Sequence, residues 1–77
     1  MSTKELVLNI LKEVKPVYDL SDVTDIVDSG YLDSFELMLL ISRLSEDFGI
    51  EIEVDDIVPE NFNSADAITA MVDRLKK

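Results

Sequence analysis

Apolar residues recur every three or four positions in three parts of this chain, the spacing of one face of an α-helix. The clearest of these runs begins directly after the segment GYLDSF at positions 30–35. Its apolar members are Leu37, Leu40, Ile41, Leu44 and Phe48. This spacing predicts a helix over residues 34–48 that ends at Gly49, and it points to a fold made by packing helices.

Two further helices flank this one in the sequence. Ser2 or Thr3 is the expected N-cap of the first, which ends before Pro16. Its apolar face consists of Leu6, Val7, Ile10, Leu11 and Val14. Ser64 is the expected cap of the last helix. The apolar face of that helix consists of Ala65, Ile68, Val72 and Leu75.

The connections between these helices also carry apolar residues. Residues 16–33 form a long, Asp-rich connection, and we expect its apolar side chains to pack on the helices: Val17, Leu20, Val23, Ile26 and Val27. Residues 50–54 alternate like a strand but have no second strand to pair with. We therefore expect an extended connector that buries Ile50, Ile52 and Val54, followed by a short helical turn over residues 55–58.

Together these elements predict an all-α fold. We expect a single domain over residues 1–77, built as a small antiparallel four-helix bundle of three main helices and one short helix, with a long first loop. A chain of 77 residues buries only about 60% of its unfolded surface, so its core is thin. Such a domain is too small to enclose a deep active site.

Cysteine and histidine are both absent from the chain. Disulfides and thiolate metal sites are therefore excluded, and no histidine is present to activate a serine nucleophile. We expect a protein without catalytic activity of its own and without a resident metal ion. No apolar run approaches the roughly 18 residues of a membrane span, and no signal peptide is evident, so a cytoplasmic protein is expected.

The formal net charge is −10, and it is unevenly distributed. Fifteen of the seventeen acidic residues lie between Pro16 and Asp73, where Arg43 is the only basic residue. Such a field repels nucleic acid and anionic lipid and attracts basic protein surfaces. The alternative is that the charge only keeps a small monomer in solution. We expect a monomer with basic protein partners and no nucleic-acid or membrane partner.

The predicted helix over residues 34–48 has two features that suggest a binding role. Ser34 lies where backbone N–H groups lack intrahelical partners, so a phosphate on its hydroxyl would be favoured there. Phe35 and Leu39 point away from the predicted core, with Met38 at the border. They form a docking surface unless the long loop covers them. The acidic residues expected to rim this surface are Glu46, Asp47, Asp55 and Asp56.

These residues resemble the phosphopantetheine-dependent carrier proteins, which include acyl, aminoacyl and peptidyl carriers. The likeness covers nearly the whole chain: Asp33-Ser34 precedes the helix, Phe48-Gly49 ends it fourteen residues later, and Ser64 opens the last helix. It implies that Ser34 accepts a 4′-phosphopantetheine arm from coenzyme A through a separate Mg-dependent phosphopantetheinyl transferase. The terminal thiol of the arm then holds cargo as a thioester. Asp33 would present the serine and approach the metal ion of the transferase, unless it acts only as an N-cap.

Within that family, Gly-x-Leu-Asp-Ser-Phe is most similar to D-alanyl carriers and other free-standing carriers loaded by adenylate-forming ligases. Fatty-acid-synthase carriers usually have a glutamate five residues after the serine, where this chain has Leu39. The resemblance implies a free-standing acyl carrier that meets acyltransferases or synthases through their basic docking patches. The alternative is an aminoacyl carrier of the D-alanyl kind, loaded by a ligase. The cargo, and whether it belongs to fatty acid or secondary metabolite biosynthesis, stays open.

Cargo on such carriers lies between helices, and the resemblance implies a pocket for it. The residues expected to line that pocket are Leu37, Leu44, Ile52 and Ile57. The alternative is that each of them is an ordinary core residue.

Two other functions compete with the carrier hypothesis. Residues 25–36 imitate a calcium-binding EF-hand loop, with Gly30 sixth and Glu36 twelfth, although Val27 at the third position offers no side-chain oxygen. The second alternative is a helical adaptor whose Phe35 and Leu39 bind a partner without any modification of Ser34.

Overall fold

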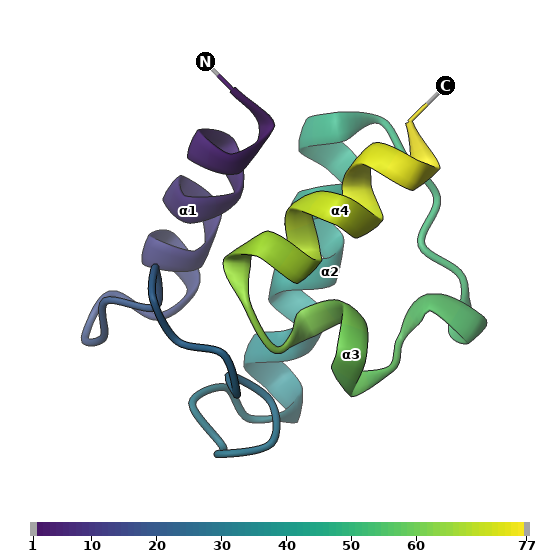
Figure 1. Ribbon diagram of the computed structural model, residues 1–77. Helices are drawn as coiled ribbons and strands as arrows, with labels where there is room; N and C mark the ends of the chain where they lie inside the picture. The colour runs from purple at the N-terminus through teal and green to yellow at the C-terminus, as the bar shows by residue number, and fades with distance from the viewer. Residues whose placement is uncertain (1, 77) are drawn as a thin grey trace.

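The computed structural model describes residues 2–76, and this part of the chain is helical, with no strand (Figure 1). The α-helices are α1 (Thr3–Val14), α2 (Ser34–Phe48), α3 (Pro59–Phe62) and α4 (Ala65–Leu75), and a 3-10 turn, η1, spans Val54–Asp56. Helix α1 packs against α2 and α4, and the short α3 packs against α4. The structure therefore confirms an all-helical fold with four helices, consistent with a small bundle.

Each long helix begins at a side chain that accepts a hydrogen bond from the first turn. Ser2 Oγ accepts from the Glu5 N–H at 3.1 Å in α1, and Ser64 Oγ accepts from the Ala67 N–H at 2.9 Å in α4. Helix α2 ends at Gly49, whose φ of 62° is left-handed and is tolerated best by glycine. The sequence signals for helix ends were therefore accurate, and Ser2 rather than Thr3 caps α1.

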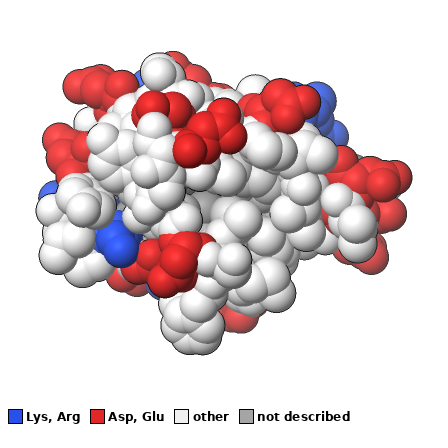
Figure 2. Space-filling model, turned by 90° about the horizontal axis from the view of Figure 1, so that it is seen from below, with Lys and Arg blue, Asp and Glu red and all other residues white. Residues whose placement is uncertain are grey.

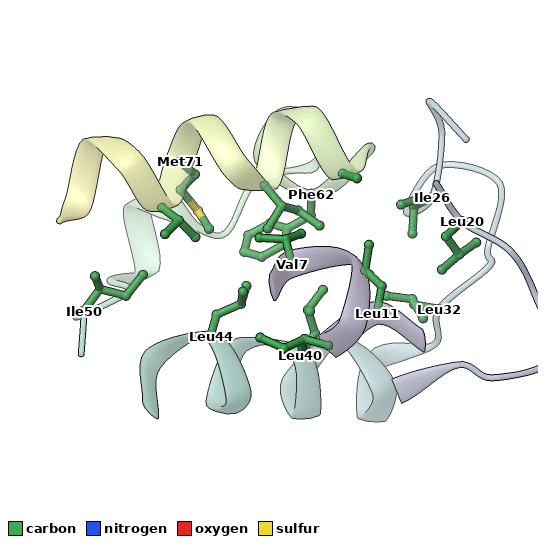
Figure 3. Close-up of a cluster of buried hydrophobic side chains, with 14 residues drawn as sticks. Val7, Leu11, Leu20, Ile26, Leu32, Leu40, Leu44, Ile50, Phe62 and Met71 are labelled. Carbon is green, nitrogen blue, oxygen red and sulfur yellow. The ribbon is translucent and has the colours of Figure 1, made fainter. Parts of the chain in front are cut away.

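The core lies between the helices and is closed by residues from the connections (Figure 3). Leu40 and Leu44 on α2 are fully buried, as the predicted spacing requires. The connections add Leu20, Ile26, Leu32 and Ile50 to this cluster. The other buried members from the helices are Val7, Ile10, Leu11, Phe62, Ala65, Ile68, Met71 and Val72.

Two expectations about the connections were wrong. Val17 and Val54 were expected in the core, but they are 76% and 83% exposed. Val54 turns outward because the chain stops being extended and enters η1 at that residue. The helical turn expected over residues 55–58 is present as η1, and it is followed by α3, which has Pro59 at its first position and Phe62 buried.

The segment between α1 and α2 has no helix but is attached at several points. Asn63, at the junction of α3 and α4, accepts hydrogen bonds through Oδ1 from the N–H groups of Val27 (3.0 Å) and Asp28 (3.1 Å). The Asn63 carbonyl accepts a further bond from the Ile26 N–H at 2.9 Å. These bonds hold the chain a few residues before Ser34.

Within residues 2–76, no helix combines the length and the apolar character that crossing a bilayer requires.

Candidate functional site

Ser34 is the first residue of α2, and its side chain is exposed. The first hydrogen bond of the helix runs from the Leu37 N–H to the Asp33 carbonyl at 2.9 Å. The N–H groups of Ser34 and Phe35 therefore have no intrahelical acceptor. No atom in residues 2–76 forms a hydrogen bond with the Ser34 hydroxyl, which leaves it free to react.

Asp33 and Glu36 fix the point at which this helix begins. Asp33 Oδ1 accepts from the Glu36 N–H at 2.7 Å, and Glu36 Oε1 accepts from the Asp33 N–H at 3.0 Å. This reciprocal pair is a capping box, and it confirms that Asp33 is the N-cap. Ser34 is thus held between two residues whose side chains are committed to the backbone.

Lys15 joins this capping box to the end of α1. Its Nζ lies 3.1 Å from Glu36 Oε1 and 2.9 Å from Glu36 Oε2, so both carboxylate oxygens accept from it. The two side chains are only 24% and 18% exposed. The hydrogen bond from the Asp33 N–H and the bond from Lys15 lower the pKa of Glu36, and the bond to Glu36 raises the pKa of Lys15.

Two tyrosines continue this contact into the segment before the serine. The Lys15 ammonium lies 5.8 Å from the ring centre of Tyr18, within the range of a cation–π interaction. Tyr18 meets Tyr31 edge to face at 5.2 Å, and Tyr31 lies three residues before Ser34. The sequence did not reveal this set of contacts, because no local pattern joins Lys15 to a residue 21 positions away.

The chain has seven serines, and five of them already use their hydroxyl groups. Ser2 and Ser64 cap helices, while Ser45 Oγ donates to the Ile41 carbonyl. Ser21 and Ser29 donate to nearby aspartates. In residues 2–76, only Ser34 and Ser42 lack such a bond, and Ser42 lies in the middle of α2 rather than at its start.

The apolar residues expected to face solvent on α2 do so. Phe35 is 71%, Met38 61% and Leu39 42% exposed, so the loop does not cover them. Figure 2 views the molecule from the end at which α2 begins, and it shows a broad area of uncharged side chains bordered by acidic ones. This combination is typical of a surface that meets a partner with apolar and basic groups.

The four acidic residues expected beside this surface differ in their contacts. Glu46 and Asp55 are exposed, but Asp47 Oδ2 lies 3.3 Å from Arg43 Nη2. Arg43 also pairs with Glu13 at 2.7 Å, so the charge of Asp47 is partly neutralised. Asp56 Oδ2 accepts from the Glu53 N–H at 3.1 Å and thereby helps to form η1.

A small apolar cavity of about 70 Å³ lies beside the first turn of α2. Leu37 and Ile57, two of the four residues expected in a cargo pocket, are among its lining residues. Leu44 is not, because it is fully buried in the core, and half-buried Ile52 lies outside the cavity lining. The residues that line the cavity are Val27, Leu37, Ile57, Val58, Pro59 and Phe62.

The oxygens of the EF-hand-like window bind other groups of the chain. Glu36, at its twelfth position, accepts from Asp33 and Lys15. The Asp25 carboxylate, at its first position, accepts from the Ser29 hydroxyl. Across residues 2–76, no cluster of three or more acidic side chains is arranged to hold a metal ion.

The start of α2 fits a phosphate ester on Ser34. The hydroxyl is exposed, two backbone N–H groups are free beside it, and the positive end of the helix dipole lies there. The carboxylates of Asp33 and Glu36, in the same turn, each accept a hydrogen bond from a backbone N–H group.

Comparison with known proteins agrees with this geometry. Residues 4–72 match the family model described as "Phosphopantetheine attachment site". The D-alanyl carrier protein of Streptococcus suis (strain 05ZYH33) is 35% identical over 74 residues, covering 94% of this chain and 92% of the relative. The D-alanyl carrier protein of Lactobacillus acidophilus is 35% identical over 78 aligned positions, covering 99% and 98%. That of Lactobacillus helveticus is 33% identical with the same coverage.

The family match covers far more than half of the chain, and the relatives align over nearly its whole length. The chain therefore belongs to the phosphopantetheine attachment-site family, whose members carry a covalent 4′-phosphopantetheine on a serine.

Proposed function

We propose that this chain is a free-standing carrier protein and that Ser34 is the serine that bears its 4′-phosphopantetheine arm. The observation that carries this proposal is the state of the Ser34 hydroxyl, which is exposed, without a hydrogen-bond partner in residues 2–76, and located at the first residue of a helix. Ser42 shares the free hydroxyl but not the helix start. Its neighbouring N–H groups are used within the helix, so they are not free to bind a phosphate.

Attachment requires an enzyme that this chain does not supply. Ser34 Oγ forms a bond to the phosphorus of coenzyme A that carries the pantetheine, and the bond from that phosphorus to the bridging oxygen breaks. Adenosine 3′,5′-bisphosphate leaves with the electron pair. The proton of the Ser34 hydroxyl passes to a base of the Mg-dependent transferase, because no side chain in residues 2–76 accepts a hydrogen bond from it. The chain is a substrate in this step.

The cargo that we assign is an aminoacyl group of the D-alanyl kind, loaded by an adenylate-forming ligase. When bound, the arm supplies a terminal thiol for a thioester. The names of the relatives support this cargo. A longer acyl cargo is the alternative.

The surface that meets the transferase and the ligase is assigned to the exposed side of α2. Phe35, Met38 and Leu39 supply its apolar part. The acidic rim consists of Glu46, Asp47, Asp55 and Asp56. Basic patches on the partner enzymes would pair with this rim and orient the carrier. In this proposal the carrier is a monomer, and its helices form an antiparallel bundle whose long first loop leads to Ser34.

The attachment is tested by intact mass spectrometry. The protein is incubated with coenzyme A, Mg²⁺ and a broad-specificity phosphopantetheinyl transferase. We expect the mass to rise by one phosphopantetheine in the wild type and in Ser42→Ala, which removes the other free hydroxyl. Ser34→Ala should gain nothing. A gain in Ser34→Ala equal to that of the wild type would contradict the assignment.

The cargo is tested on the modified protein. It is incubated with ATP and D-alanine in the presence of a D-alanine-activating ligase, and in parallel with a fatty acid and an acyl carrier synthetase. We expect the mass of one alanyl group to be added in the first reaction only. Loading in the second reaction alone would favour the longer acyl cargo.

A further inference from the structure

The contact between Lys15 and Glu36 lies beside the attachment serine, yet neither residue has a role in the proposed chemistry. Lys15 immediately follows α1, and its N–H donates to the Leu11 carbonyl at 2.9 Å, so its backbone is fixed. Its ammonium reaches both oxygens of Glu36 at 2.9 and 3.1 Å. Hydrogen bonds in which a partner is ionised are roughly twice as strong as bonds between neutral groups.

Glu36 transmits this contact to the residue before the serine. The carboxylate oxygen Oε1 accepts both from Lys15 and from the Asp33 N–H, the latter at 3.0 Å. Lys15 thus holds Glu36 in the orientation that the capping box requires. The first turn of a helix frays more readily than its interior, and Ser34 lies in that turn. A fixed capping box therefore fixes the backbone at Ser34 and the direction of its Cα–Cβ bond, from which the hydroxyl projects.

We propose that Lys15 and Glu36 are positioning residues for the modification of Ser34: by binding α1 to the first turn of α2, they hold the backbone that carries the serine in one conformation for the transferase. This inference rests on the proposed function of Ser34. It adds two residues that contact neither coenzyme A nor the transferred phosphorus and that act only through the backbone at Asp33 and Ser34.

Lys12 provides a matched control for charge. It lies in the last turn of α1, is exposed, and forms no ion pair within residues 2–76. Lys12→Met and Lys15→Met make the domain more acidic by the same amount. If only long-range attraction to a basic transferase mattered, both variants would be modified as fast as the wild type or faster. Positioning instead predicts a loss for Lys15→Met alone.

The first measurement is the kcat/KM of the phosphopantetheinyl transferase for each variant, at a temperature where circular dichroism reports a folded protein. We expect Lys15→Met and Glu36→Gln each to lower kcat/KM by about threefold to tenfold. The double variant should lose little more than the worse single variant, because both changes break one contact. Lys15→Arg should retain most of the rate. Equal values for Lys15→Met and Lys12→Met would overturn the proposal.

The second measurement does not depend on the transferase. Amide hydrogen exchange of the unmodified protein, followed by NMR, reports opening of the first turn of α2. We expect faster exchange at Leu37, the first residue whose N–H is bonded in the helix, in Lys15→Met but not in Lys12→Met. Unchanged exchange would overturn the proposal even if Ser34 is modified. If the transferase fails to modify the wild type, the proposed function is contradicted. Amide exchange at Leu37 can still be measured in that case, because it needs no modified protein.

Discussion

Replacing Asn63 with alanine tests how the segment before Ser34 is held to the helices. Three hydrogen bonds of the Asn63 side chain would be lost. Two run to Oδ1 from the N–H groups of Val27 and Asp28, and one runs from Nδ2 to the Asp28 carboxylate at 3.1 Å. The bond from the Ile26 N–H to the Asn63 carbonyl is a backbone bond, so alanine retains it.

The magnitude follows from how far each bond is shielded from water. The partly buried bond from Val27 contributes about 1 kcal/mol, and each exposed bond to Asp28 about 0.5 kcal/mol. Asn63→Ala should therefore lower the free energy of unfolding by about 2 kcal/mol. For a domain of this length, that corresponds to a fall in Tm of about 8–16 °C.

Urea unfolding followed by circular dichroism measures this change. We expect the midpoint of Asn63→Ala to fall while the m value stays unchanged, since the same surface is exposed on unfolding. Asn9→Ala is the control, because Asn9 is an exposed residue of α1 that forms no side-chain hydrogen bond within residues 2–76. Its free energy should stay within about 0.5 kcal/mol of the wild type. A similarly small change for Asn63→Ala would show that these bonds do not hold the segment before Ser34.

Three further predictions concern stability. Leu44→Ala should lower the free energy of unfolding by about 2–5 kcal/mol, because the side chain is fully buried; a loss below about 1 kcal/mol would contradict its place in the core. Gly49→Ala should cost about 1 kcal/mol in thermal unfolding, because its φ of 62° strains any residue with a Cβ, and a neutral result would argue against this helix end. The pKa of Glu36 is lowered by the Asp33 N–H and by Lys15, so its ionised form stabilises the fold above its ordinary pKa. This stability is lost as the pH falls through the lower pKa of the folded state. Glu36→Gln should therefore flatten the acid side of the stability curve, and an unchanged curve would contradict the contact.

The helices could be predicted from the sequence because their signals are local. The spacing of apolar residues and the ends at Asp33 and Gly49 located α2 correctly. The same spacing separated the buried Leu44 from the exposed Phe35. Each of these inferences uses residues within one or two helical turns, where backbone geometry alone decides which side chains share a face.

The connections were less predictable because their conformation depends on distant partners. Val54 fits an alternating strand pattern, yet it is exposed because the chain enters η1 there. Asn63 binds residues about 35 positions earlier, and Lys15 binds Glu36 from 21 positions away. No periodicity connects residues at such separations, so the contacts that hold the serine in place emerged only from the structure.

Fragmentation mass spectrometry of the modified protein locates the phosphopantetheine arm on one residue. After reaction with coenzyme A and a transferase, we expect the phosphopantetheine mass on the peptide that contains Ser34, and fragment ions that assign it to the Ser34 side chain. An arm found on Ser42 or on any other residue would contradict the account, as would a wild-type protein that gains none.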